Sequence, residues 1–258
     1  MPHFLYFCPI LIVFLNIMEV KTQAIVLHTL KYGDSQLIVD MFTEKLGKVS
    51  FAVRIATSSR SRMKRQYFQN MNLLFVEFDY RQKANLQKLR NVSIAVPYKD
   101  IPFSPYKMSM SMFLAEFLSR CLRHEQANAA LFLFLKNSLS WLDEAGKGYA
   151  NFHIVFMIHL TLFLGFMPNV EMEEGNVFFD MQEGCFVPRI PVRHPYLQGH
   201  DTELMRTLLR LNYSTMHLFT MSRDERNRCV DVILKYYKLH LPDFTDLKSL
   251  DILKELFV

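Results

Sequence analysis

The stretch QLIVDMFTEKLGKVSFAVRIA, residues 36–56, decides the fold of the first part of the chain. Apolar and polar residues alternate strictly through 48–56, as they do in a strand with one buried face. The residues of that apolar face are Val49, Phe51, Val53 and Ile55. An aliphatic segment, 36–43, precedes it, and the intervening EKLGK carries Gly47 where a tight turn needs a positive φ. The stretch therefore predicts an antiparallel hairpin.

Further strand patterns surround this hairpin, at residues 21–29, 72–80 and 86–96. The sequence YGD at 32–34 is a turn signal, and the polar segment TSSRSRMKR, residues 57–65, is expected to form a loop. Five short strands in so short a stretch favour a small closed barrel of the SH3-like or OB type. Prolines at positions 97, 102 and 105 mark its end. We expect one domain over residues 18–97.

The apolar period becomes helical after this unit. Helices are predicted at residues 105–122, 127–141, 149–164, 201–211, 223–240 and 247–256. The third should bury one broad apolar stripe, and Ser222 with Glu225 forms a capping box before the fifth. A short β-like pair interrupts the helices in a Gly- and Pro-rich insert at about 175–195. The expected fold class is α+β, with a five-stranded OB-type barrel followed by an α-helical domain over residues 98–258.

The positive charge of the chain is concentrated in its first third. Residues 18–97 hold thirteen Lys and Arg against six Asp and Glu, whereas the rest of the chain is slightly acidic. Such segregation is typical of a module that binds a polyanion. The densest run, RSRMKR at 60–65, is by itself equally compatible with a solvated loop, and the charge segregation favours nucleic acid. The candidate DNA-binding residues are Lys48, Arg54, Arg60, Arg62, Lys64, Arg65 and Arg81.

Aromatic residues near these bases have two interpretations. Tyr67, Phe68 and Tyr80 are suited to stacking on bases, but such residues more often belong to a barrel core. Phe51 alternates with valines, so we assign it to the core. For Tyr67 and Tyr80, both interpretations stay open.

Enzymatic and metal-binding patterns are missing from the sequence. It contains no HExxH, no GxxxxGK[ST], no GxSxG and no CxxC, and its cysteines are far apart. Cys185, His194 and His200 are a weak ligand set for zinc, and ordinary loop histidines are the better interpretation. We therefore expect no catalytic residues, no cofactor and no metal, and unpaired cysteines in a reducing cytosol.

The first seventeen residues, MPHFLYFCPILIVFLNI, are strongly apolar. They lack the charged start and the cleavage site of a signal peptide, and they are too short to span a membrane. The alternatives are a peripheral anchor or an upstream extension, with translation starting at Met18, and we favour the latter. No membrane partner is expected.

Arg120, Arg123 and His124 follow an apolar helix and allow two interpretations. They could form a cationic rim beside a hydrophobic groove for an acidic, apolar tail of another protein. They could equally be favourable charges at the C-terminus of a helix, which is the interpretation that we prefer.

Several short motifs, taken in order, resemble the bacterial RecO family. They are Met18-x-x-Lys21-x-x-Ala24-Ile25-Val26-Leu27, Tyr32-Gly33-Asp34-Ser35, Thr43-Glu44-x-x-Gly47-Lys48, the basic loop with Ser61 and Arg62, and LTLFLGFMP at 160–168. The resemblance implies an OB domain followed by a helical domain, in a cytoplasmic, nucleoid-associated protein. Many members carry a four-cysteine zinc finger after the last motif, but residues 177–195 here keep only Cys185.

The implied activity is non-enzymatic. Such a protein would bind single- and double-stranded DNA, anneal complementary strands, and act with RecR and single-strand-binding protein so that RecA can load. Two other functions stay open from the residues themselves: a protein-interaction scaffold, and an RNA-binding OB-fold protein.

Overall fold

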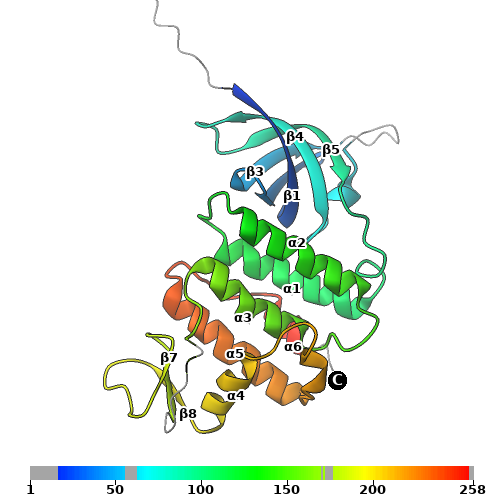
Figure 1. Ribbon diagram of the computed structural model, residues 1–258. Coiled ribbons are helices and arrows are strands. Elements are labelled where there is room, and N and C mark those ends of the chain that lie inside the picture. Colours follow the sequence, from blue (N-terminus) through cyan, green and yellow to red (C-terminus); the bar gives the residue numbers. More distant parts are fainter. Residues whose placement is uncertain (1–16, 56–62, 170, 172–176, 256–258) are drawn as a thin grey trace, which may run out of the picture.

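The computed structural model describes residues 17–55, 63–169, 171 and 177–255. The expected hairpin forms: β2 (Gln36–Thr43) pairs antiparallel with β3 (Gly47–Arg54). Gly47 adopts a φ of +69°, as the turn requires. A barrel at one end of the molecule rests on a helical body, so the fold is α+β (Figure 1).

The barrel closes in the strand order of an OB fold. β1 (Ile17–Tyr32), β4 (Leu73–Arg81) and β5 (Gln87–Ile94) join the hairpin in the order β1-β2-β3-β5-β4, with β1 and β4 paired. Only the β3–β5 pair is parallel. β1 pairs with β4 through its first half and with β2 through its second, and its register shifts between Val26 and His28. This bulge lets one long strand bend around the barrel.

The interior of the barrel is filled by the alternating residues that the pattern indicates. Val26, Val39, Phe51 and Phe78 are fully buried there, and the rings of Phe51 and Phe78 meet edge to face with centroids 4.9 Å apart. The assignment of Phe51 to the core is therefore confirmed. Tyr67 and Tyr80 are partly buried and pack against the same core, so neither is a free stacking platform.

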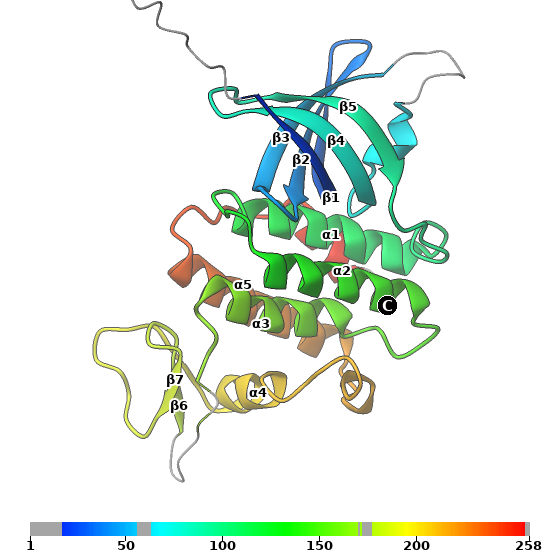
Figure 2. The same cartoon turned by 45° about the horizontal axis from the view of Figure 1, so that its top comes forward.

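The remainder of the chain forms helices and a small three-stranded sheet. The helices are α1 (Pro105–Cys121), α2 (Ala129–Glu144), α3 (Phe152–Leu164), α4 (His200–Leu208), α5 (Arg223–His240) and α6 (Leu250–Lys254). The strands are β6 (Phe178–Asp180), β7 (Cys185–Val187) and β8 (Tyr196–Gln198). Of two short 3-10 turns, η2 (Met216–Leu218) belongs to this part, and η1 (Arg65–Phe68) lies between β3 and β4 of the barrel. α1 and α2 lie directly under the barrel, whereas α4 and the small sheet lie at the far end (Figure 2).

Helix α3 differs from the sequence-based expectation. A single buried stripe was predicted, but every residue from Phe152 to Ile158 is buried. The reason is that α2, α4 and α5 all contact α3, so no face of its first turns is left to solvent. The helix ends at Leu164, where the predicted helix 149–164 ends, and the next residue, Gly165, has a φ of +83°; the Ser222–Glu225 capping box at the start of α5 also forms as predicted.

The barrel and the helical body share one packed boundary. Ala24 and Val26 of β1 point into the barrel, whereas Ile25 and Leu27 belong to the core of the helical body. Phe42 extends the same core from β2 and stacks near Phe132 of α2, with ring centroids 6.3 Å apart. β1 is therefore buried on both faces here, and burial of both faces holds the two parts against each other.

The expectation for residues 1–17 falls almost wholly outside the described residues, of which Ile17 is the first and opens β1. Within the described ranges, no helix has the length and apolar character needed to cross a membrane.

Candidate nucleic-acid interface

The outward face of β3 carries the first candidate residues. Val49, Phe51 and Val53 point inward, so the alternate positions face out. These are Lys48, Ser50, Ala52 and Arg54. Ser50 and Ala52 are small, which lets an extended ligand lie close to the backbone between the two cations. In OB folds, the face of strands 2 and 3 is the usual site for oligonucleotides.

The two cations on β3 are far apart and differ in their surroundings. They are six residues apart, or about 20 Å along a strand. Arg54 is exposed and, among the residues described, has no ion-pair partner. Lys48 is different: its Nζ lies 3.3 Å from a carboxylate oxygen of Asp40 on β2, and its side chain is only 17% exposed. Lys48 is thus partly neutralised, which the sequence did not indicate.

Strand β5 adds a residue that the sequence analysis missed. The parallel pairing of β3 with β5 sets Lys88 opposite Ala52, and Lys88 is exposed. Its position beside β3 depends on a pairing between segments far apart in sequence, so no local pattern could have found it.

Tyr32, 62% exposed at the β1–β2 turn, was missed as well, because it was considered only as part of a turn signal. The turn that it borders is one of the loops that OB folds use for ligands.

The other candidates lie around this face. Arg81 ends β4 and is exposed, and its backbone is fixed by Gln87, whose side chain accepts from Arg81 N at 3.0 Å and donates to Arg81 O at 2.9 Å. Lys64 and Arg65 are exposed at the start of η1. Arg60 and Arg62 lie outside the described residues. The five candidates that the structure describes are therefore spread around the barrel and do not form one compact cluster.

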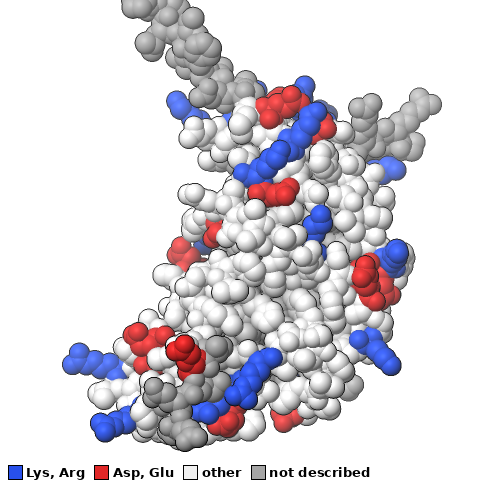
Figure 3. Space-filling model, in the orientation of Figure 1, with Lys and Arg blue, Asp and Glu red and all other residues white. Residues whose placement is uncertain are grey.

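A second face of the barrel, across β1, β4 and β5, is electrically balanced. Lys21 pairs with Glu19 and Glu77, and Arg90 pairs with Glu19 and Asp79. Figure 3 shows charges of both signs side by side over the barrel. Exposed pairs of this kind contribute little to stability, about 0–1 kcal/mol. The pairs offset one another's charge, whereas Arg54 on β3 and Lys88, two residues before Arg90 on β5, have no ion-pair partner among the described residues.

The small sheet β6–β7–β8 occupies the insert in which relatives were expected to carry zinc. Asp180 accepts from His194 Nδ1 at 3.0 Å and from the backbone N–H groups of Gln182 and Glu183. Burial alone would raise the pKa of Asp180, but these hydrogen bonds lower it below its usual value. Cys185 is the only cysteine of this sheet. Within the described ranges, no three His, Cys, Asp or Glu residues gather as metal ligands.

A closed five-stranded barrel of OB strand order, carried on a helical body, defines a two-part OB-fold protein. The model of the N-terminal part of recombination protein O matches residues 18–98, and that of its C-terminal part matches residues 102–251. The chain belongs to the RecO family of DNA repair proteins.

Whole relatives agree with this assignment. DNA repair protein RecO of Phocaeicola vulgatus is 47% identical over 237 residues, which cover 92% of this chain and 98% of the relative. The RecO protein of Bacteroides fragilis is 44% identical with the same coverage. That of Flavobacterium psychrophilum is 36% identical over 93% of this chain and all of its own length.

Proposed function

We propose that this protein is a non-enzymatic mediator of DNA repair and homologous recombination. It binds single- and double-stranded DNA, anneals complementary strands, and helps to load a recombinase on DNA coated with single-strand-binding protein. Its partners are DNA, RecR and single-strand-binding protein, with RecA reached indirectly, in the bacterial cytoplasm at the nucleoid. Membership of the RecO family supports the repair role.

The observation that carries the DNA-binding part is the outward face of β3 and β5. Arg54 and Lys88 are exposed cations without ion-pair partners among the described residues. Ser50 and Ala52 have small side chains, so a nucleic-acid strand can lie close to the backbone of β3. Lys64, Arg65 and Arg81 extend the positive charge around this face. Cations that replace the counterions of phosphates give binding that weakens as salt rises.

Fluorescence anisotropy with labelled oligonucleotides, measured over a range of salt concentrations, tests this proposal. We expect Arg54→Ala and Lys88→Ala each to weaken binding of single strands and duplexes and to reduce the salt dependence. Arg90→Ala is the matched control, because Arg90 is already paired with Glu19 and Asp79. Binding that does not depend on salt, or that Arg90→Ala weakens as much as Arg54→Ala does, contradicts the proposal.

Two further measurements separate the alternatives. RNA oligonucleotides of the same sequence bind more tightly than DNA if the barrel is an RNA-binding module. A protein-interaction scaffold would retain partner proteins and show no affinity for either nucleic acid. For the mediator, annealing of complementary strands coated with single-strand-binding protein should be faster with the wild-type chain than with Arg54→Ala.

A further inference from the structure

Three cavities follow one another along the boundary between the barrel and helix α1. The central one has a volume of about 540 Å³. It shares Lys48 and Arg123 with a neighbour of about 230 Å³, and Asn70 and Met112 with another of about 340 Å³. Because adjoining cavities share their walls, they form one groove, which we call the seam groove. It runs beside α1 from Met108 to Arg123, about 22 Å at the rise of a helix.

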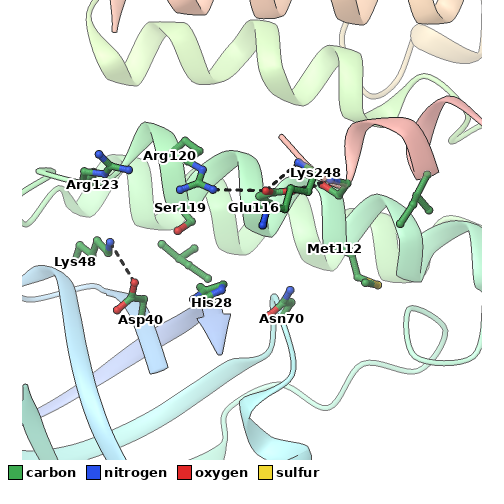
Figure 4. Close-up of a pocket in the computed structure, with 13 residues that line it drawn as sticks. His28, Asp40, Lys48, Asn70, Met112, Glu116, Ser119, Arg120, Arg123 and Lys248 are labelled. Atoms are coloured by element: carbon green, nitrogen blue, oxygen red, sulfur yellow. Dashed lines mark hydrogen bonds and ion pairs between the residues drawn. The ribbon is translucent and has the colours of Figure 1, made fainter. Parts of the chain in front are cut away.

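The two walls of the seam groove come from different parts of the fold. Arg120 and Arg123, in and just beyond the last turn of α1, line one side of the central cavity, and Lys48 of β3 lines the other; Arg120 points along α1 to Glu116 (Figure 4). Met112 lies further along α1, opposite Asn70, which precedes β4. One end of the groove is therefore cationic, and the other is lined by the thioether of Met112 and the side-chain amide of Asn70.

The guanidinium groups at the cationic end are incompletely used within the fold. Arg123 is exposed and has no hydrogen-bond or ion-pair partner among the described residues. Arg120 makes one long ion pair, with 3.7 Å between its Nη2 and Glu116, while its Nε is buried and donates to no described group. A buried donor without an acceptor costs about 1–3 kcal/mol. Arginine also matches the geometry of phosphate oxygens.

The two acidic residues of the central cavity, Glu116 and Asp40, offset only part of its positive charge, because four Lys and Arg residues line the same cavity. Glu116 accepts from the backbone N–H groups of Lys248 and Ser249, at 3.1 and 2.8 Å, and from Ser249 Oγ. Burial alone would raise the pKa of Glu116, but these hydrogen bonds, with Arg120, lower it. The Glu116 carboxylate is thus held by hydrogen bonds from the residues just before α6. The other acid, Asp40, is engaged by Lys48 and by Ser50 Oγ.

We propose that the seam groove binds a short run of single-stranded nucleic acid. Phosphates lie at Arg120, Arg123 and Lys48, and unstacked bases lie at Met112 and Asn70. This inference rests on the proposed DNA-binding function and extends it onto the helical body. The groove is continuous with the barrel face, because Lys48 belongs to both.

The recessed shape favours a single strand over a duplex. A duplex presents its phosphates on the outside of a stiff helix and keeps its bases stacked inside, so it has nothing to place at Met112. A single strand can turn its phosphates toward one end of the groove and place apolar base faces and polar base edges at the other. For Arg120 and Arg123 the preferred interpretation from the sequence was favourable charge at a helix C-terminus, and the alternative was a cationic rim for an acidic tail of another protein. Because both residues line the wall of the seam groove, we infer that they bind phosphates of the nucleic acid.

Binding to oligothymidylate and to a duplex of equal length, measured with the full chain at fixed salt, tests the seam groove. We expect Arg123→Ala to weaken single-strand binding about tenfold, the value of one charge-assisted hydrogen bond. Its salt dependence should fall by about 0.7 in slope for one lost phosphate contact. Duplex binding should stay within about twofold, within the spread expected of a surface substitution. Lys235→Ala, which removes an exposed charge from α5, is the control and should change neither.

Photocrosslinking gives an independent readout that does not depend on a substitution. Oligothymidylate carrying 5-iodouracil should crosslink to Met108 or Met112, located by mass spectrometry of the digested chain. Crosslinks confined to the barrel overturn the seam groove, as does an Arg123→Ala variant that binds single strands like wild type.

The outcomes also separate this inference from the proposed function. If Arg54→Ala weakens all DNA binding and Arg123→Ala weakens none, the barrel binds DNA and the seam groove does not. If the wild-type chain binds no DNA, both fail. If Arg123→Ala spares DNA but abolishes binding of a labelled Asp- and Phe-rich peptide, the groove is a protein-docking site and the inference is wrong.

Discussion

Gly47 packs directly against Glu125. The backbone N–H of the next residue, Lys48, donates to the carbonyl oxygen of Glu125 at 3.2 Å, and a Cβ on Gly47 would overlap that oxygen. The turn between β2 and β3 is thereby docked on the connection between α1 and α2. This contact fixes one end of the seam groove, because Lys48 and Arg123 line it on either side.

Gly47→Ala should destabilise the chain more than a turn substitution alone. The positive φ costs about 1–2 kcal/mol for an L-residue, and the overlap with Glu125 adds to this. Gly33→Ala is a matched control, because Gly33 has the same φ of +69° but open space around it. Urea unfolding should show a larger loss of unfolding free energy for Gly47→Ala. Equal losses would mean that the contact with Glu125 contributes nothing.

Asp143 anchors the segment that leaves the barrel. Its carboxylate accepts from the backbone N–H groups of Lys99, Asp100 and Ile101 at 2.8–2.9 Å, beside the buried ammonium of Lys107. Burial alone would raise the pKa of Asp143, but these hydrogen bonds and the charge of Lys107 lower it. We expect Asp143→Asn to cost about 2 kcal/mol of stability at neutral pH.

The same substitution predicts a change with pH. A carboxyl group whose pKa is lowered by folding stabilises the native state above its usual value of 3.8, and that stability is lost as the pH falls below it. Unfolding measured from about pH 6 to about pH 2.5 should therefore converge for wild type and Asp143→Asn at the acid end. Glu144→Gln, at an exposed neighbouring position, should follow wild type throughout. A constant difference at every pH would show that the Asp143 charge is not responsible.

The insert should hold its shape without metal. The Asp180–His194 hydrogen bond ties β6 to the loop before β8, and the backbone N–H groups of Gln182 and Glu183 tie Asp180 to the turn that follows β6. We expect chelation with EDTA to leave the Tm unchanged, and Asp180→Ala to lower it through loss of these bonds. Elemental analysis of the purified chain should find zinc well below one equivalent. One zinc per chain, lost together with stability on chelation, would refute this account.

Asp40 should restrain DNA binding through Lys48. Their ion pair occupies the Lys48 ammonium, and Ser50 Oγ donates to the same carboxylate. Asp40→Asn keeps an acceptor for Ser50 and frees the ammonium, so affinity for oligonucleotides should rise several-fold at low salt, with a steeper salt dependence. Asp79→Asn, on the balanced face of the barrel, should have a smaller effect. An unchanged affinity for Asp40→Asn would place Lys48 outside the interface.

Local patterns predicted the elements of this protein closely. The segment 36–43 is β2, the helix at 223–240 is α5, and Gly47 and Gly165 have the positive φ values expected of a turn and a helix end. These features depend on residues within a few positions of one another. β8 was missed because its only strand partner, β6, lies about fifteen residues earlier in the chain, beyond the reach of a local pattern.

The sequence by itself determined the alternation of the barrel strands, the helical period of the rest and the segregation of positive charge. Only the tertiary structure decided which charges act together. The parallel β3–β5 pairing brings in Lys88, the contact between β2 and β3 neutralises Lys48 with Asp40, and the docking of α1 beneath the barrel adds Arg123. The physical reason is one of range. Hydrophobic periodicity and secondary-structure propensity depend on residues a few positions apart in the sequence, whereas the interaction of two charges depends on their distance in space, which the tertiary fold sets.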